Sequence, residues 1–379
     1  MSTNHSHQSP TTLAPKEASG ASSPAPRSFQ PMKMSTKPKP RQVVIDPDGE
    51  LSLTVGRQER VTFVVCPKTL ARASPFFKRL LYGGFAESIR PDRNIEKEWN
   101  PELPEDSPEA MEIFLNIVHS RFDKIPIFVN PILWNSTTTI LSYRTLYQLT
   151  VLTDKYDLTR ILRPWVQNWV KDMHTNLTFV NLCSLYKKPR FIELHSWIAW
   201  ELGDKTTFSN AADYFILHSI TDQEGGLRLD GADSMRLFSS SLELTGLSSL
   251  VKDKRLEIIR KMLDPVKDVV ARLIQGSSKS LCTGVSDHVD CEVTMLGAIV
   301  RSLTPRGLYP IPNPEDISIS IVQLADKLEC MDSRSRLHGH KCTALPKIAI
   351  KTLKKANPQL AELHLKHLKA QAEKTGLGS

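Results

Sequence analysis

The chain has 379 residues, a net charge of +8 and 40% hydrophobic residues, a composition typical of a globular protein with room for two domains. No apolar run approaches the roughly 20 residues that span a bilayer, and the N-terminus has no apolar stretch of the secretory type, so we expect no membrane partner. The six cysteines are widely spaced, which favours free thiols in a reducing compartment, the cytoplasm or the nucleus.

Much of the excess positive charge lies at the two ends of the chain, in residues 33–41 and 347–374. A nucleic-acid-binding surface would need these charges on one folded face. A solvated tail and a solvated helix face explain them more simply, so we expect no nucleic-acid partner.

Residues 1–42 are rich in Ser, Thr, Pro and Lys, with Phe29 as their only bulky aromatic residue. Such a segment buries too little apolar surface to offset the entropy of ordering, which predicts a disordered N-terminal tail. The ordered chain is expected to begin at Val43. Apolar and polar residues alternate strictly in 51–55, and a second strand-like run follows in 61–65, so the two runs predict a β-hairpin.

Helical spacing takes over after the hairpin. Apolar residues recur every three or four positions from Leu70 to Leu80, and Ser74-Pro75 interrupts them, which predicts two short helices or one kinked helix. Residues 94–103 indicate a further strand. Ser107-Pro108 predicts the start of the next helix, since an N-cap is followed by proline at the first position. Beyond it we expect a long inserted loop at 126–144, a helix that Thr145 caps, and a helix that buries residues from Leu162 to Val170.

The second half is expected to be mainly helical. We predict a helical extension at 174–275, a polar linker at 276–290 and a helical C-terminal region at 291–379. The apolar spacing places helices at 191–202, 211–220, 251–273, 296–303, 317–328 and 347–372. Pro265 should kink the third of these helices, and Asn357-Pro358 should split the last.

Residues 43–173 resemble a BTB/POZ domain in the order of these elements and in several motifs. The similar segments are Asp48–Val55, Phe63–Phe77, Leu103–Asp106 and Asp154–Asp157. The resemblance implies an α+β fold in which a small β-sheet is flanked by a cluster of helices, followed here by the mainly α-helical C-terminal region. It also implies a protein-interaction module that often pairs with itself, so a homodimer is one expectation.

The C-terminal half is similar to the extension found in BTB proteins of filamentous fungi. The similar segments are Arg163–Trp165, Ile198–Asp204, Arg255–Ile259 and Gly307–Pro310. Two features depart from the family. Cys66 stands where many members have His, and the insertion at 126–144 lengthens a normally short connection. Both changes are expected to alter the interaction surface rather than the fold.

One motif of the resemblance points to a particular partner. Cullin-binding members of the BTB family often carry an apolar residue, any residue and then an acid just after the helical hairpin, and Phe85-Ala86-Glu87 falls in that place. The apolar side chain would fill a groove on the cullin scaffold while the acid contacts the rim of that groove. The alternative interpretation is that Phe85 packs inward.

Two groups of residues could carry chemistry. Cys291, Cys330, His340 and Cys342 are side chains of the kinds that bind zinc, and His338 and Cys282 lie near them in sequence. The set lacks paired C-x₂-C knuckles, so ordinary cysteines and loop histidines are the simpler interpretation. Cys66 lies at a strand-to-helix junction, where a thiol pKa can be lowered. The sequence identifies no His or acid partner for it, and a packing role is favoured.

The sequence contains no Gly-rich phosphate loop, no G-x-S-x-G and no H-E-x-x-H. We therefore expect no enzymatic activity and no catalytic residue. The leading hypothesis is a protein-protein interaction adaptor or scaffold. The alternatives are substrate recruitment to a cullin-type ubiquitin ligase and transcriptional co-regulation through a recruited DNA-binding partner.

Overall fold

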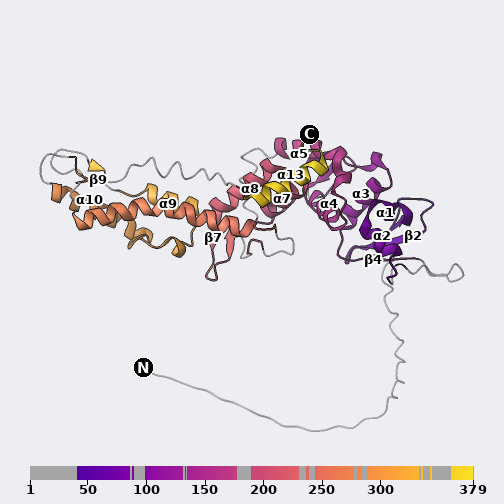
Figure 1. The fold of residues 1–379 in the computed structure, drawn as a ribbon, viewed down its shortest axis with the longest axis horizontal. Coiled ribbons are helices and arrows are strands. Elements are labelled where there is room, and N and C mark those ends of the chain that lie inside the picture. The colour runs from indigo at the N-terminus through magenta and orange to yellow at the C-terminus, as the bar shows by residue number, and fades with distance from the viewer. Residues whose placement is uncertain are drawn as a thin grey trace, which may run out of the picture. The chain divides into compact units, whose positions relative to one another are not determined.

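The computed structural model of the chain combines α-helices with small β-sheets, which agrees with the predicted α+β class (Figure 1). It describes residues 41–85, 88, 99–130, 133, 135–176, 189–229, 236–238, 244–276, 280–283, 288–332, 334–335, 342–343 and 360–378. The tail predicted at 1–42 lies outside these ranges except for Arg41 and Gln42, which already belong to the first strand. Within the described ranges, no helix combines the length and the apolar character that crossing a bilayer requires.

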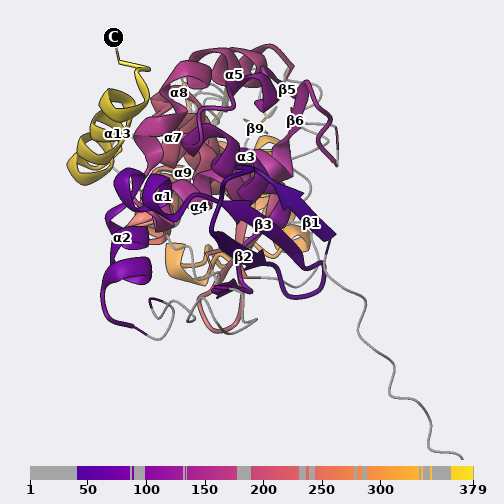
Figure 2. The same ribbon diagram turned by 90° about the vertical axis from the view of Figure 1, so that its right-hand side faces the viewer.

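The largest sheet has four strands in the order β1-β3-β2-β4 (Figure 2). The strands are β1 (Arg41–Val44), β2 (Leu51–Val55), β3 (Val61–Val65) and β4 (Glu102–Leu103). β2 and β3 pair antiparallel, with Leu51 opposite Val65, which confirms the predicted hairpin. β1 runs parallel to β3, and β4 runs parallel to β2. β4 is shorter than the strand predicted within 94–103, of which residues 94–98 lie outside the described ranges.

Two short helices follow the hairpin, as the Ser74-Pro75 signal predicts. They are α1 (Pro67–Ala73) and α2 (Pro75–Tyr82). Ser74 separates them because its Oγ accepts hydrogen bonds from the N–H groups of Phe76 and Phe77 and so caps α2. Its own hydroxyl donates to the Tyr156 carbonyl at 2.8 Å, which ties the helical pair to the helices that follow.

Three helices complete this part of the fold. α3 (Pro108–Val118) begins at Ser107 as predicted, because Ser107 Oγ accepts a hydrogen bond from the Ala110 N–H. The 3₁₀ turn η2 (Phe122–Lys124) comes next, and then α4 (Tyr143–Lys155), the 3₁₀ turn η3 (Thr159–Leu162) and α5 (Arg163–Asn176). The prediction that Thr145 caps α4 is wrong. Ser142 is the cap, since its Oγ accepts a hydrogen bond from the Thr145 N–H at 3.1 Å.

The region predicted as a loop at 126–144 contains two short strands. β5 (Phe128–Asn130) and β6 (Ile140–Ser142) pair in parallel, with Phe128 opposite Ile140. The prediction of one continuous loop is therefore wrong. Strands of three residues are too short to show an alternation in the sequence, so pattern alone does not reveal them.

The second half is mainly helical, as predicted, and short strand pairs join some of the helices. The elements are α7 (Pro189–Leu202), α8 (Lys205–His218), β7 (Ser219–Thr221), β8 (Leu227–Leu229), α9 (Leu247–Gln275), α10 (His288–Leu303), η4 (Thr304–Arg306), η5 (Pro314–Asp316), α11 (Ile321–Glu329), β9 (Arg334–Ser335), β10 (Cys342–Thr343) and α13 (Glu362–Thr375). β7 pairs antiparallel with β8, and β9 with β10.

Several boundaries in this half differ from the sequence predictions. α9 extends beyond the predicted 251–273 at both ends and continues through Pro265, so the kink predicted there stays a prediction. α10 begins at His288, inside the predicted linker at 276–290. α8 begins earlier than the predicted 211, because Asp204 caps it by accepting a hydrogen bond from the Thr207 N–H. The split predicted at Asn357-Pro358 lies outside the described residues.

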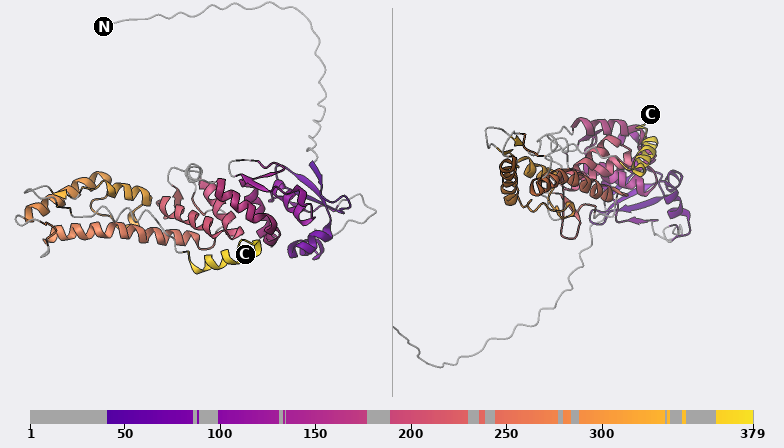
Figure 3. Two further views of the ribbon diagram at one scale, coloured as in Figure 1. Left: turned by 90° about the horizontal axis from the view of Figure 1, so that it is seen from above. Right: turned by 60° about the vertical axis from the view of Figure 1, so that its left-hand side comes forward.

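The buried hydrophobic residues form two cores that meet at α7. The first core runs from Ile45 to Met173 and includes Ile198 and Leu202 of α7. The second core runs from Ile192 to Leu368 and takes the opposite residues of α7, Ala199 and Trp200. α10 lies against α9 within the second core (Figure 3). α7 therefore contributes one face to each core, which explains why its apolar residues are not confined to a single stripe.

Candidate functional site

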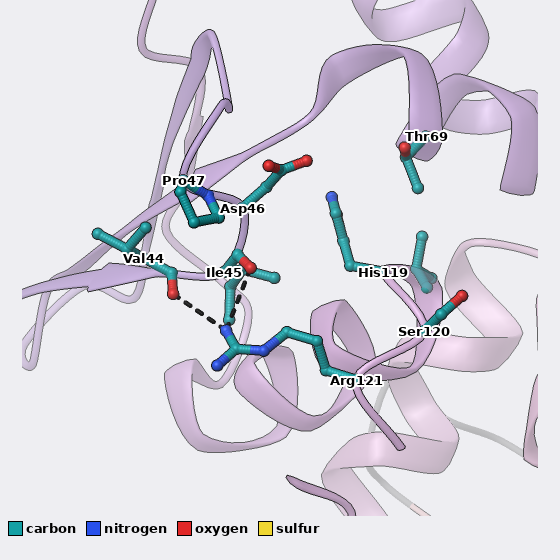
Figure 4. Close-up of a pocket in the computed structure, with 9 residues that line it drawn as sticks. Val44, Ile45, Asp46, Pro47, Thr69, His119, Ser120 and Arg121 are labelled. Carbon is teal, nitrogen blue, oxygen red and sulfur yellow. Dashed lines mark hydrogen bonds between the residues drawn. The ribbon is translucent and has the colours of Figure 1, made fainter. Parts of the chain in front are cut away.

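An open pocket of about 520 Å³ lies where β1 ends, beside the start of α1 and the end of α3 (Figure 4). Val44, Ile45 and Asp46 line one side of it, and His119 and Arg121 line the other. Arg121 Nη1 donates hydrogen bonds to the carbonyls of Val44 and Ile45 at 3.0 and 3.1 Å. The guanidinium thus fixes the end of β1 against the turn that follows α3.

His119 in this pocket contacts the backbone of Cys66, whose thiol the sequence offers as a candidate nucleophile. His119 Nδ1 donates to the Leu115 carbonyl at 2.9 Å, and Nε2 accepts a hydrogen bond from the Cys66 backbone N–H at 3.2 Å. Burial lowers the pKa of His119 and keeps the ring neutral. Because both ring nitrogens are occupied by backbone groups, His119 holds the strand-to-helix junction in place and does not act as a base on the thiol.

Beside this pocket, β1 offers an open strand edge and an exposed apolar side chain. β1 is the outermost strand of its sheet, so one of its edges has no neighbouring strand among the described residues (Figure 2). Large hydrophobic side chains are exposed on β1 itself and on the segment directly after Arg121: Val44, Phe122, Ile127 and Phe128. An edge strand with apolar neighbours can accept another strand or a partner protein.

Phe85, the first residue of the predicted cullin-binding motif, points outward rather than into the core. Its side chain is 56% exposed, and Tyr82 at the end of α2 is also exposed. Its carbonyl accepts a hydrogen bond from the Ser88 N–H at 2.9 Å. Glu87, the acid of the motif, lies outside the described residues.

Three cysteines converge in the second core. Cys282 precedes α10, Cys291 lies in its first turns and Cys342 belongs to β10, and their Sγ atoms all lie within 4.8 Å of one another. The sulfurs of Cys282 and Cys342 are 3.7 Å apart, although the two residues are 60 positions apart in the chain. All three side chains are buried. The three thiols could therefore hold a metal ion.

This cluster overlaps only in part with the set that the sequence singles out. Cys291 and Cys342 belong to it, whereas Cys330 is exposed at the end of α11 and is not among the three thiols. His340 lies outside the described residues, as does His338. Cys282 is the residue that the zinc prediction did not include. Its nine-residue spacing from Cys291 differs from the paired C-x₂-C pattern of zinc sites, so the fold and not the spacing reveals that the two lie together.

Polar contacts around the cluster favour a charged sulfur. Thr283 donates its backbone N–H to Cys342 Sγ at 3.4 Å, and its hydroxyl lies 3.5 Å from the same sulfur. Burial raises the pKa of the Cys342 thiol, but hydrogen bonds from Thr283, Cys282 and Cys291 more than offset this and lower the pKa to about 7. Glu292 of α10 accepts from Leu281 N–H at 2.8 Å and from Ser280 Oγ at 2.7 Å, which fastens the Cys282 segment to the helix.

The comparisons with known proteins add no relative: no protein-family model, no curated protein and no solved structure matches this chain.

Proposed function

We propose that the chain is a non-enzymatic adaptor or scaffold that binds other proteins through a BTB/POZ-type domain in its first half. The observation that carries the proposal is the arrangement of residues 41–176. A β-hairpin is followed by two short helices, a short strand that returns to the same sheet, and then three helices; apart from β1 before the hairpin and the β5–β6 pair between α3 and α4, this is the order expected of that domain. The sequence motifs named above lie on these elements, which supports the proposal.

The surface at the edge of β1 supports binding rather than catalysis. It combines an open strand edge with exposed apolar side chains, and such a surface suits pairing with a second copy or with another protein. His119, the imidazole in the pocket beside it, is neutral and is engaged by backbone groups on both nitrogens. The second core would then present a further surface to other partners.

Recruitment of substrates to a cullin-type ubiquitin ligase is the second candidate, and the outward position of Phe85 favours it. The test is pull-down of a purified cullin by the tagged full-length protein. Phe85→Ala should reduce the recovered cullin at least tenfold, as expected for an apolar anchor residue. Ile274→Ala is the matched control, because Ile274 is 61% exposed, close to the 56% of Phe85, but lies on α9 in the second half of the chain.

The outcomes of this pull-down separate the candidates. Absence of cullin from the wild-type sample eliminates the ligase role and leaves the general adaptor. Affinity purification with mass spectrometry then identifies its partners, and a protein that captures none at any concentration contradicts the adaptor role. Transcriptional co-regulation through a DNA-binding partner stands as the third candidate, and exclusion of the tagged protein from the nucleus throughout growth contradicts it.

We also propose that the three-cysteine cluster binds zinc as a structural cofactor. Zinc bonds thiolate sulfur at about 2.3 Å in a tetrahedron, which places two ligand sulfurs about 3.8 Å apart. The observed 3.7 Å between Cys282 and Cys342 fits this spacing. β9 and β10 have only two residues each, so the hairpin has little packing of its own. A metal bond from Cys342 to α10 would hold it there.

Metal analysis of the purified full-length protein tests the zinc proposal. We expect one zinc per chain, loss of most of it in Cys291→Ser, and full retention in Cys330→Ser, whose cysteine is exposed and outside the cluster. Replacement of zinc by Co²⁺ gives a second readout, since thiolate ligands produce an intense charge-transfer absorption. A wild-type protein purified under reducing conditions that binds neither metal contradicts the proposal.

A further inference from the structure

The C-terminal helix α13 is attached to the rest of the fold through a face that is mostly polar. It packs against α7, η3 and α5, and Figure 2 shows it along the outer side of α7. The residues that it buries are His364, Leu368, Gln371 and Thr375, so Leu368 is the one aliphatic side chain among them. A helix held in this way depends on specific contacts more than on apolar burial.

Two hydrogen bonds of α13 are made at the end of α7, while His364 bonds to the Thr245 carbonyl at 3.0 Å. Gln371 Nε2 donates to Glu201 Oε2 at 2.8 Å, and Glu201 also accepts a hydrogen bond from the Thr159 hydroxyl. Thr375 Oγ1 donates to the Leu202 carbonyl at 2.8 Å. We call Thr159 together with Trp200–Gly203 the α13 docking site.

Gly203 gives this docking site its shape. A Cβ at this position would lie 2.2 Å from Ala372 N and 2.6 Å from Ala372 Cα, so the backbone of α13 occupies the space that any side chain would need. Gly203 also has a φ of +81°, which favours glycine. On the other side of the glycine, the ring of His367 stacks on Trp200 with 3.7 Å between ring centroids. The site therefore accepts a helix only where the helix backbone can come as close to Gly203 as that of Ala372 does.

Several polar atoms on the same face of α13 are buried without a partner. His364 Nδ1, His367 Nε2 and Gln371 Oε1 have no hydrogen bond in the described structure. Each of them loses its hydrogen bond to water when α13 docks, which costs free energy that the docked state does not return. The docking site is therefore specific for the shape of α13, but the desolvation of these polar atoms reduces the free energy gained on docking. A helix held in this way is readily exchanged.

We propose that the α13 docking site is an exchangeable helix-binding site, and that the α13 of a second copy of this chain docks there in place of the chain's own α13. A second copy presents the same Gln371, Ala372 and Thr375 to the same site, so complementarity is preserved without any new contact. The 18 residues at 344–361 span up to about 60 Å when extended, which gives the helix the reach for exchange. This proposal stands apart from the adaptor function and the zinc site.

A fluorescent peptide of residues 360–378 tests the site on full-length protein. The wild-type protein should bind it weakly, because its own α13 competes. Leu368→Asp removes the buried aliphatic contact of that helix, so this variant should bind the wild-type peptide at least tenfold more tightly. Adding Gly203→Ala should abolish the gain. Adding Gly225→Ala should not, because Gly225 has a similar φ of +75° but no atom within 4 Å of a Cβ. Equal peptide binding with and without Gly203→Ala overturns the proposal.

Light scattering measures exchange between copies. The wild-type protein should form a concentration-dependent dimer that excess peptide dissociates and that Gly203→Ala prevents. A protein that stays monomeric overturns the proposal. A dimer that resists both treatments also overturns it, and assigns dimerisation to another surface, such as the edge of β1, without affecting the adaptor function.

Hydrogen exchange on the wild-type protein needs no variant. Amides of α13 should exchange at least tenfold faster than those of α7, and equal protection of the two helices overturns the proposal that α13 undocks.

Discussion

Among the described residues, the buried polar side-chain atoms of the first core have hydrogen-bond partners with one exception, whereas several in the second core have none. Asp106 is buried in the first core and accepts hydrogen bonds from Lys155 Nζ at 2.6 Å and from the Tyr156 hydroxyl. Among the described residues of the second half, buried atoms without a hydrogen bond are Trp197 Nε1, Asp213 Oδ1, Ser219 Oγ, His288 Nδ1, His364 Nδ1, His367 Nε2 and Gln371 Oε1. The described part of the first half has only Asn116 Oδ1.

The difference indicates two modes of stabilisation. In the first half a satisfied polar network specifies one arrangement of sheet and helices. The second half joins segments far apart in sequence through a few polar anchors, among them Arg255, the three cysteines and the α13 docking site. Removing one such contact should therefore lower the free energy of unfolding more in the second half than in the first. A bound ligand or an exchanged helix should likewise stabilise the second half more.

The largest effect is expected for Arg255 in the second half. Its guanidinium is buried and donates to the carbonyls of Ser219 at 3.2 Å and Ile317 at 3.1 Å, and also to that of Ile319. Arg255→Met would leave these carbonyls unsatisfied and should lower the free energy of unfolding by roughly 3–5 kcal/mol. Urea denaturation measures it.

Arg260 on the same helix is the matched control for Arg255. It forms an exposed ion pair with Glu315 at 2.5 Å, so Arg260→Met should change the stability by no more than about 0.5 kcal/mol. Equal effects of the two substitutions would show that the carbonyl contacts of Arg255 do not anchor the second half.

A smaller effect is expected for Asp106 in the first half. Asp106→Ala removes the acceptor of the buried Tyr156 hydroxyl, which should cost about 2–3 kcal/mol. This cost is lower than that of Arg255→Met because the side chain of Lys155 is 40% exposed and can bind water when Asp106 is removed. The neighbouring Glu105 pairs with Arg57 at the surface, so Glu105→Ala should be nearly neutral in the same denaturation experiment. If Asp106→Ala lowers the free energy of unfolding more than Arg255→Met does, the first half, and not the second, is the more sensitive to the loss of a buried polar contact.

The elements that the sequence predicts well are those with a local signal. Ser74-Pro75 and Ser107-Pro108 each combine a cap with a proline at the first helical position, and both helices begin there. The hairpin of β2 and β3 follows from alternation and a short connection. The parallel pairing of β1 with β3 and the strands inside 126–144 escape prediction, since their partners are chosen by tertiary packing and not by neighbouring residues.

The candidate sites show the same limit. Cys342 stands out in the sequence because Cys330 and His340 lie close to it, and Cys291 lies upstream, yet the structure joins Cys291 and Cys342 to Cys282 instead. The spacing of cysteines in a sequence does not predict a cluster whose sulfurs come from a loop, a helix and a strand. The α13 docking site is harder still to foresee. It depends on a glycine at the end of one helix meeting the backbone of another more than 160 residues later.

The smallest predicted effect is a pH dependence that arises at the docking site. Burial raises the pKa of Glu201 to about 8, although hydrogen bonds from Thr159 and Gln371 favour its charged form. The folded protein therefore keeps this proton up to about pH 8, while the unfolded chain loses it near the ordinary value of 4.5. Between these limits the folded state binds more protons, so stability falls as the pH rises.

Urea denaturation from pH 5 to pH 8 should show this fall in the wild-type protein, and Glu201→Gln should remove it. The expected loss is on the order of 1–2 kcal/mol, less than the pKa alone implies, because undocking of α13 lets water reach the ionised carboxylate. Glu257→Gln is the control, since ion pairs with Lys254 and Lys261 lower the pKa of exposed Glu257 to about 2 and keep it charged throughout. Parallel curves for wild type and Glu201→Gln would mean that Glu201 stays solvated, and that α13 does not cover it in solution.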